Sequence, residues 1–135
     1  MKVIACGGRA YEDDVIVDIV LDHLHRKTPV TLLIHGGATG ADVLARSWAM
    51  RRGVPTDTYP AAWQHHGLAA GHIRNGWMLR EGQPDLVVAF PGGDGTADMV
   101  RQARGAGVPV AAVERDGRVR GEGRRFFPVR MRRVA

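Results

Sequence analysis

The chain has 135 residues, 44 % of them hydrophobic and 24 % charged, which is typical of one soluble globular domain. No apolar run approaches the roughly 20 residues of a membrane span, and a single cysteine excludes an internal disulfide. The net charge of +5 resides at the end of the chain, since residues 1–113 hold 11 Lys+Arg and 11 Asp+Glu, whereas residues 114–135 hold 8 arginines and 3 acids.

Strand and helix patterns alternate regularly along the body of the chain. Strands are expected, in chain order, at residues 2–5, 31–35, 56–60, 85–90 and 108–113. Helices are expected at residues 13–25, 41–48, 68–81 and 96–107, and in the first of these Ile16, Ile19, Val20 and Leu24 share one face. Apolar strands that alternate with helices imply right-handed crossovers into a buried parallel sheet. The pattern predicts an α/β fold, a single Rossmann-like doubly wound domain with a mainly parallel sheet flanked by helices on both faces.

The opening residues 1–10 favour a first strand over a signal peptide, because a single lysine precedes a short apolar run that stops at glycine. The expected compartment is the cytoplasm, and no membrane partner is expected. Cys6 should be a small core residue at the end of that strand. It has no companion at metal-ligand spacing, so neither a metal site nor a cofactor is predicted.

Residues 114–135 form the basic end of the chain and are interpreted as a C-terminal extension of a domain at residues 1–113. The segment contains an Asp-Gly turn signal, then Arg124 and Arg125, and then Phe126 and Phe127. It fits an added hairpin with its arginines on the solvated face, a disordered basic end, or a contact for phosphate backbones.

Three glycine-rich turns occupy equivalent places: "CGGRA" after the first strand, "HGGATGAD" after the second and "PGGDGT" after the fourth. In a parallel sheet all three lie at the carboxyl edge, where ligands bind. Glycine permits a close approach of the backbone, so that N–H groups before a helix can point at an anion. Tight packing is the alternative explanation for each turn. Neither "GGATGAD" nor "PGGDGT" fits the dinucleotide-binding or P-loop pattern.

These turns, together with "AGHIRNGWML" and in this order and spacing, resemble the SLOG superfamily of Rossmannoid nucleotide-binding domains, and within it the YspA-like branch. The resemblance covers about residues 2–113. "HGGATGAD" and the pair Arg74-Asn75 resemble motifs of DprA, the DNA-uptake protein. "PGGDGT" resembles the signature of the "Lonely guy" phosphoribohydrolases, and Arg74 with Met78 fits that family's arginine helix.

The resemblance implies a nucleotide pocket, whereas a catalytic residue stays unknown. In the phosphoribohydrolases the signature continues to a glutamate that assists cleavage of the N-glycosidic bond, and here that position is Met99. Asp98 lies about 100° away around the helix, so it does not simply replace the glutamate. Met99 and Ala103 share a face and are expected in the core.

Individual side chains have competing interpretations. Arg74 is expected to meet a phosphate or to form an internal salt bridge, and Arg9 is a candidate to face the same ligand. Asp42 either complements the helix dipole or contacts ribose hydroxyls, and Asn75 has the same alternatives. His65 and His66 are interpreted as loop residues, with base stacking or proton transfer as the alternative. The residues expected to bind the nucleotide are Gly8, Arg9, Gly36, Gly37, Ala38, Gly40, Asp42, Arg74, Asn75, Pro91, Gly92, Gly93, Gly95 and Thr96.

Two classes of function follow. The first is a sensor or binding module for a nucleotide or nucleotide-derived small molecule, bound at the carboxyl edge of the sheet. The second is a phosphoribohydrolase-like enzyme that releases a base from a nucleoside monophosphate. Single-stranded DNA binding is a weaker alternative. A homodimer is also expected, because the helices offer apolar faces with Trp48 and Trp77.

Overall fold

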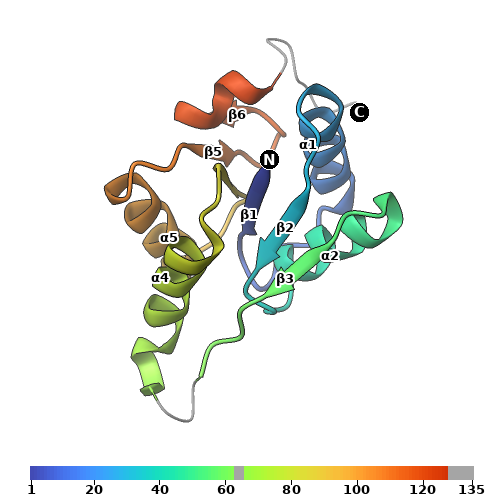
Figure 1. The fold of residues 1–135 in the computed structure, drawn as a ribbon. Helices are drawn as coiled ribbons and strands as arrows, with labels where there is room; N and C mark the ends of the chain where they lie inside the picture. The colour runs from blue at the N-terminus through green and yellow to red at the C-terminus, as the bar shows by residue number, and fades with distance from the viewer. Residues whose placement is uncertain (63–65, 128–135) are drawn as a thin grey trace.

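The computed structural model describes residues 1–62 and 66–127, which form a six-stranded sheet with helices on both faces (Figure 1). The strand order is β3-β2-β1-β4-β5-β6. The strands are β1 (Lys2–Cys6), β2 (Leu32–His35), β3 (Thr56–Thr58), β4 (Leu86–Ala89), β5 (Val110–Val113) and β6 (Val119–Arg120). The first five pair in parallel, and β6 pairs antiparallel with β5. The predicted Rossmann-like, mainly parallel α/β fold is confirmed.

Within the described residues, four α-helices and one 3₁₀-helix lie between the strands, and a second 3₁₀-helix follows β6. They are α1 (Asp14–Lys27), α2 (Ala41–Arg52), α4 (Ala70–Gly82), α5 (Asp94–Gly105), η1 (Gly67–Ala69) and η2 (Glu122–Phe126). Asp13 caps α1, because its carboxylate accepts the N–H of Ile16 at 3.0 Å. Gly53 ends α2 in the left-handed conformation, with φ of 69°.

The sheet separates two hydrophobic cores, because successive residues of a strand point to opposite faces. Val3 and Ala5 of β1 face the core beneath α1 and α2, whereas Ile4 faces the core beneath α4 and α5. Met99 and Ala103 of α5 are buried in this second core, which confirms the expectation for both residues. The two layers are visible on either side of the sheet in Figure 1.

Three sequence expectations about packing need correction. Ile19 is half-buried, because the buried face of α1 is centred on Val17, Val20 and Leu21 instead. Trp48 is fully buried in the core of the monomer, with its indole N–H donated to Asp22 at 2.8 Å, so it offers nothing to a partner. Cys6 packs against the core beneath α4 and α5 but is not enclosed by it, because it also lines a pocket at the end of β1.

Residues 114–127 lie against the edge of the sheet. The N–H of Glu114 donates to the carbonyl of Arg118 at 2.8 Å, which closes the hairpin between β5 and β6. η2 then packs on β5, and Phe127 is buried in the core beneath α1. Residues 128–135, like Trp63 and His65, lie outside the described residues. The division into a domain at 1–113 and an extension at 114–135 stays a prediction.

The order of the strands places a topological switch point between β1 and β4. The chain proceeds from β1 to β2 and β3 on one side, and from β4 to β5 on the other. In open α/β sheets ligands bind in the crevice outside the carboxyl ends of the strands at such a point. The turns after β1 and β4 therefore flank the expected binding crevice. Among the helices of residues 1–62 and 66–127, none has the length and apolar character that crossing a membrane requires.

Candidate functional site

The turn after β1 is joined by backbone hydrogen bonds to the other two glycine-rich turns. The N–H of Gly8 donates to the carbonyl of Pro91 at 2.9 Å, and the carbonyl of Gly8 accepts the N–H of Ala41 at 3.1 Å. A Cβ atom at Gly40 would lie 2.2 Å from the carbonyl oxygen of Gly8, and one at Gly92 would lie 2.7 Å from the Gly8 nitrogen. These glycines are needed because the turns pack on one another, which is the packing explanation left open by the sequence.

The turn after β2 is organised by two buried side chains, Asp42 and His35. Oδ2 of Asp42 accepts the N–H groups of Gly36 at 3.0 Å and of Ala38 at 3.1 Å. Nδ1 of His35 accepts the N–H of Gly37 at 3.0 Å. The N–H groups of Gly36, Gly37 and Ala38 therefore have internal acceptors, so the expectation that these three groups point at a bound anion needs correction.

The protonation of these two side chains follows from their burial. Because Nδ1 of His35 accepts the N–H of Gly37, the neutral ring carries its proton at Nε2. Nε2 lies 3.0 Å from the hydroxyl of Thr58. Burial lowers the pKa of His35 and favours this neutral form. Burial also raises the pKa of Asp42, although the N–H groups of Ala38 and Gly36 partly offset that effect. Oδ1 of Asp42 has no hydrogen-bond partner among the described residues.

Arg74 of α4 is held with its guanidinium partly buried at the same edge. Its Nη1 donates to the carbonyl of Gly36 at 2.9 Å, and its Nε donates to Oδ1 of Asn75 at 3.1 Å. Burial lowers the pKa of Arg74, an effect that the nearby charge of Asp42 opposes. Within residues 1–62 and 66–127, no carboxylate forms an ion pair with Arg74, so its charge is not neutralised by the internal salt bridge considered from the sequence.

The turn after β4 leads into the first turn of α5, which keeps unpaired donors at the pocket. Gly93 is the N-cap, and its carbonyl accepts the N–H of Ala97 at 3.0 Å. The N–H groups of Asp94, Gly95 and Thr96 have no acceptor in the part of the chain that the structure describes. A Cβ atom at Gly93 or at Gly95 would meet nothing within 4 Å. This helix end is therefore open to an anion.

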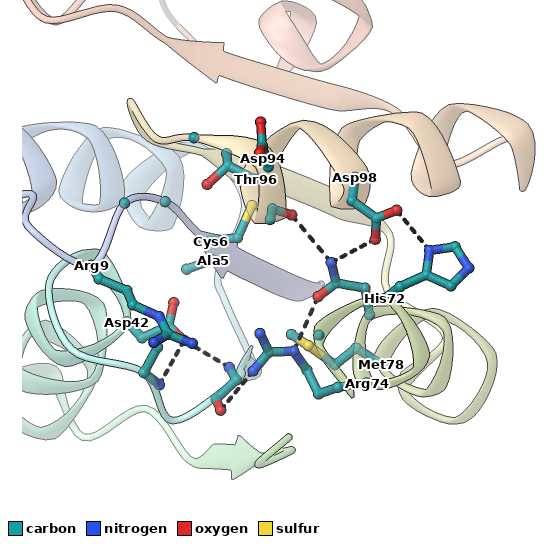
Figure 2. Close-up of a pocket in the computed structure, with 18 of the residues that line it drawn as sticks. Ala5, Cys6, Arg9, Asp42, His72, Arg74, Met78, Asp94, Thr96 and Asp98 are labelled. Carbon is teal, nitrogen blue, oxygen red and sulfur yellow. Dashed lines mark hydrogen bonds and ion pairs between the residues drawn. The ribbon is translucent and has the colours of Figure 1, made fainter. Parts of the chain in front are cut away.

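These elements surround a pocket of about 560 Å³, called here the main pocket, whose volume suits a small molecule. Figure 2 shows Arg74 of α4 and Thr96 of α5 on opposite sides of it, with Cys6 of β1 between them. An adjoining pocket of about 270 Å³ shares Arg9, Gly36, Ala38 and Arg74 with it. Burial raises the pKa of the Cys6 thiol to about 12, so Cys6 is a neutral wall of the pocket rather than a nucleophile.

Most of the predicted site residues meet at this place. Those that line the main pocket are Gly8, Arg9, Gly36, Ala38, Asp42, Arg74, Asn75, Gly93, Gly95 and Thr96. Gly37 lines the adjoining pocket, whereas Gly40, Pro91 and Gly92 line neither of the two. The lining residues that the sequence reasoning did not assign to the site include Cys6, His72, Asp94, Asp98 and Arg101.

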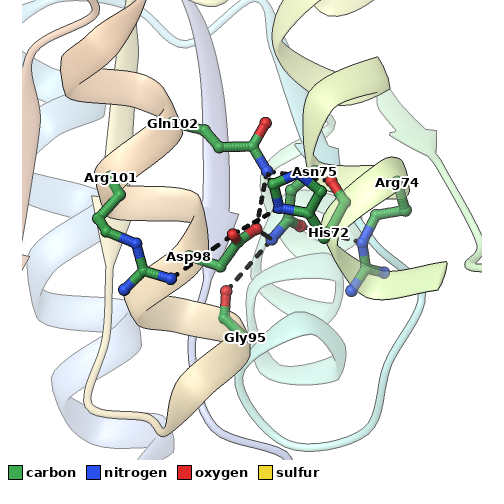
Figure 3. Close-up of polar contacts among 7 residues, drawn as sticks. All are labelled: His72, Arg74, Asn75, Gly95, Asp98, Arg101 and Gln102. Atoms are coloured by element: carbon green, nitrogen blue, oxygen red, sulfur yellow. Dashed lines mark hydrogen bonds and ion pairs between the residues drawn. The ribbon is translucent and has the colours of Figure 1, made fainter. Parts of the chain in front are cut away.

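A polar cluster joins α4 to α5 at one side of the main pocket (Figure 3). Nδ1 of His72 lies 2.7 Å from Oδ1 of Asp98. Oδ2 of Asp98 accepts from Asn75 at 3.0 Å and from Gln102 at 2.7 Å. The spacing of four residues between Asp98 and Gln102 places both on one face of α5, which was a usable signal in the sequence.

Comparison with known proteins places this geometry in a family. Residues 1–66 match the family model described as the YspA, cpYpsA-related SLOG family. The Gene 61 protein of Mycobacterium phage D29 is 40% identical over 117 residues, which cover 81% of this chain and 93% of that protein. The chain belongs to this SLOG family. The SLOG family match includes the turns after β1 and β2 and ends before Arg74 and the turn after β4.

Solved structures share the fold at low sequence identity. DprA from Streptococcus pneumoniae matches with a TM-score of 0.63 at 20% identity, over 83% of this chain and 50% of that one. A protein named TM1055 matches with a TM-score of 0.61 at 21% identity, over 82% and 72% of the two chains. MurG from Acinetobacter baumannii matches with a TM-score of 0.54 at 15% identity, over 86% of this chain and 35% of that one. The SLOG chain thus spans half the length of DprA, and these matches show that it shares a Rossmann-like fold with them.

Proposed function

We propose that the chain binds a nucleotide or nucleotide-derived small molecule, with a phosphate at the N-terminus of α5. The observation that carries the proposal is the set of unpaired N–H groups of Asp94, Gly95 and Thr96 at the wall of the main pocket. A helix N-terminus favours anions through these donors and through the helix dipole. The open space at Gly93 and Gly95 leaves room for phosphate oxygens to approach the backbone.

The magnitudes require further contacts beyond the helix dipole. A helix N-terminus contributes about 0.3–1 kcal/mol to a bound anion, whereas micromolar affinity corresponds to about 8 kcal/mol. Direct N–H hydrogen bonds add about 0.5–1.5 kcal/mol each, and a charged donor adds more. Arg74 supplies such a donor from the opposite side of the pocket, because its pairing with Gly36 and Asn75 leaves Nη2 for the ligand.

The turn after β2 has a different role in this proposal from the one its glycines suggested. Asp42 and His35 accept the N–H groups of residues 36–38, so this part of the turn acts as a wall of the pocket and holds Arg74 in place. Oδ1 of Asp42 is left to accept a ribose hydroxyl. Arg9 lies at the junction of the two pockets, where it contacts the same ligand. Single-stranded nucleic acid stays a weaker alternative, drawn from the resemblance to DprA and the basic residues 114–135.

Calorimetry with a panel of nucleoside monophosphates and with inorganic phosphate tests the proposal. Gly93→Val should fold normally, since the new side chain meets open space, and it should weaken binding at least about 10-fold by obstructing the phosphate. Gly105→Val is the matched control, because Gly105 lies on the same helix, also faces open space and lies outside both pockets. Equal affinity of both variants for every nucleotide would contradict the proposal. Tight binding of a single-stranded oligonucleotide at physiological salt would favour the alternative.

A further inference from the structure

Asn75 of α4 is buried, and its side chain lies between the two elements that are proposed to bind the ligand. It is 4% exposed, and its amide oxygen accepts the hydrogen bond from Nε of Arg74 at 3.1 Å. Its amide nitrogen donates to the carbonyl of Gly95 in the first turn of α5 at 3.2 Å and to Oδ2 of Asp98 at 3.0 Å. Figure 3 shows Asn75 between Arg74 on one side and Gly95 on the other. Asn75 therefore connects the guanidinium to the helix end that is proposed to bind the phosphate.

The neighbours of Asn75 decide the orientation of its amide group. Nε of Arg74 only donates, so it requires the amide oxygen, whereas the carbonyl of Gly95 only accepts and requires the amide nitrogen. Burial alone would raise the pKa of Asp98, but the hydrogen bonds that this carboxylate accepts lower its pKa below the ordinary value, so it too is an acceptor. Both hydrogens of the amide are thus used inside the protein, and Asn75 has none left to donate to a ribose hydroxyl.

The guanidinium of Arg74 is held through two of its nitrogen atoms. Nη1 donates to the carbonyl of Gly36, and Nε donates to Asn75. Because the guanidinium is planar, two contacts on different nitrogens fix its plane and with it the position of Nη2, whereas the contact with Gly36 alone would let the group rotate. The same amide group holds the first turn of α5 through Gly95. Asn75 therefore sets the separation between Arg74 and the N-terminus of α5.

The packing of α4 against α5 does not by itself require a buried amide. Met78 of α4 and Met99 of α5 are buried in the same core, and Gln102 joins the two helices by donating to the carbonyl of His72 at 3.0 Å. A buried amide is unfavourable unless its hydrogen bonds form, and a fully bonded one specifies a single arrangement of its neighbours. What Asn75 adds to the helix contact is the fixed separation of the two elements that bind the ligand.

We propose that Asn75 is the positioning residue that makes the site select nucleotides over free phosphate; this inference rests on the proposed function. Arg74 and the first turn of α5 lie on opposite sides of the main pocket (Figure 2). A nucleotide contacts both, with its phosphate at the N-terminus of α5 and an oxygen of its ribose or base at Arg74. Inorganic phosphate at the same helix end contacts only one of the two elements. Because Asn75 fixes their separation before the ligand arrives, binding to both at once requires less ordering.

The test compares the affinities of each protein for a nucleoside 5′-monophosphate and for inorganic phosphate, both measured by NMR titration. Asn75→Leu removes the amide and keeps a side chain of similar size. It should weaken nucleoside monophosphate binding about 10-fold or more, and leave the affinity for inorganic phosphate within about threefold of the parent value. Gln102→Leu is the matched control, because Gln102 also donates to Asp98 but has no described hydrogen bond with Arg74 or Gly95 and lies outside both pockets. It should leave both affinities within about threefold of the parent values.

A second variant and a spectroscopic signal separate this role from a purely structural one. Asn75→Ala also removes the amide, needs less space than asparagine and favours a helix, so it should fold and change the ratio of the two affinities in the same direction. The Nε–H signal of Arg74 in the NMR spectrum reports the contact with Asn75 directly. It should shift in both Asn75 variants and keep its parent position in Gln102→Leu.

Three outcomes would overturn the inference and leave the proposed function intact. The first is parent affinity of both Asn75 variants for the nucleotide. The second is an equal loss of affinity for the nucleotide and for inorganic phosphate, since the two elements would then close on the phosphate alone. The third is the same selective loss in Gln102→Leu, because any weakening of the contact between α4 and α5 would then have this effect. Failure of the parent to bind any nucleotide would overturn the proposed function as well.

Discussion

A Cβ atom on Gly36 would lie 2.0 Å from Nη1 of Arg74, so this glycine makes room for the arginine rather than for a ligand. The carbonyl of the same residue accepts the hydrogen bond that holds the guanidinium in place, at 2.9 Å. Gly36 and Arg74 therefore act as one unit. The contact explains why position 36 is a glycine although its N–H group already has an internal acceptor in Asp42.

Gly36→Ala should weaken nucleotide binding by displacing Arg74, and Arg74→Ala should weaken it by removing the charged donor. We expect each single variant to lose about 10-fold or more in affinity, because a hydrogen bond to a charged group contributes about 1.5–3 kcal/mol. The double variant should lose little beyond Arg74→Ala, since both changes remove the same contact. Calorimetry on the parent, the two single variants and the double variant gives the coupling free energy between Gly36 and Arg74. Additive losses of binding free energy would show that the two residues act independently.

Asp94 lies in the first turn of α5, where its exposed carboxylate competes with a bound phosphate for the same helix end. Asp94→Asn should therefore tighten the binding of inorganic phosphate and of nucleoside monophosphates about two- to fivefold, most clearly at low salt. Glu81→Gln on α4 removes an exposed charge outside both pockets and should change affinity less. Equal titration curves for Asp94→Asn and the parent would argue against an anion at this helix end.

Asp42 should stabilise the fold through the turn after β2. Asp42→Ala leaves the N–H groups of Gly36 and Ala38 without their acceptor, at a cost of about 1–3 kcal/mol for each one that stays buried. Asp42→Asn keeps an acceptor oxygen and should therefore lose less of the free energy of unfolding than Asp42→Ala. Denaturant unfolding of both variants measures this difference.

Because burial holds the folded-state pKa of Asp42 above its ordinary value of 3.8, the stability that Asp42 contributes should fall as the pH rises from about 3.8 through that folded-state pKa. If the parent instead became more stable relative to Asp42→Asn as the pH rises over this window, the effect assigned to the burial of Asp42 would be contradicted.

The overall fold was predictable because it depends on local periodicity. Each expected strand and helix forms within a few residues of its predicted bounds, and the glycine-rich turns gather at the carboxyl edge as the parallel topology requires. The packing of individual side chains was less predictable. Trp48 lies in the core because α2 packs closely on α1, and the sequence alone does not fix which helix faces meet each other or a partner.

The position of the candidate site could be predicted from the sequence. Which backbone N–H groups bond within the protein and which stay open to a ligand could not. A glycine that frees an N–H group for a ligand and a glycine that accommodates another loop look alike in a sequence. Gly93 faces open space, whereas Gly92 would clash with Thr96 and Gly8, and this difference arises from contacts between distant segments. The pairing of His72 with Asp98 also depends on how α4 packs against α5, so it emerges only in three dimensions.

Self-association stays a prediction, and only one of the two tryptophans that suggested it is still available to a partner. Trp48 is buried within the monomer, whereas Trp77 of α4 is half-buried and contacts His66 edge to face. We expect a homodimer by light scattering combined with size-exclusion chromatography. Trp77→Ala should shift the mass towards the monomer if that helix face is buried between two chains. A single monomer mass over a wide range of concentrations would rule the dimer out.

The most direct measurement of the central claim follows backbone amide resonances by NMR while a nucleoside monophosphate is added. The N–H groups of Asp94, Gly95 and Thr96 have no acceptor among residues 1–62 and 66–127, so their amide signals should move strongly as these groups donate to phosphate. Those of Gly36, Gly37 and Ala38 should move little, because their N–H groups stay on Asp42 and His35. Large shifts at residues 36–38 with none at residues 94–96 would contradict the account.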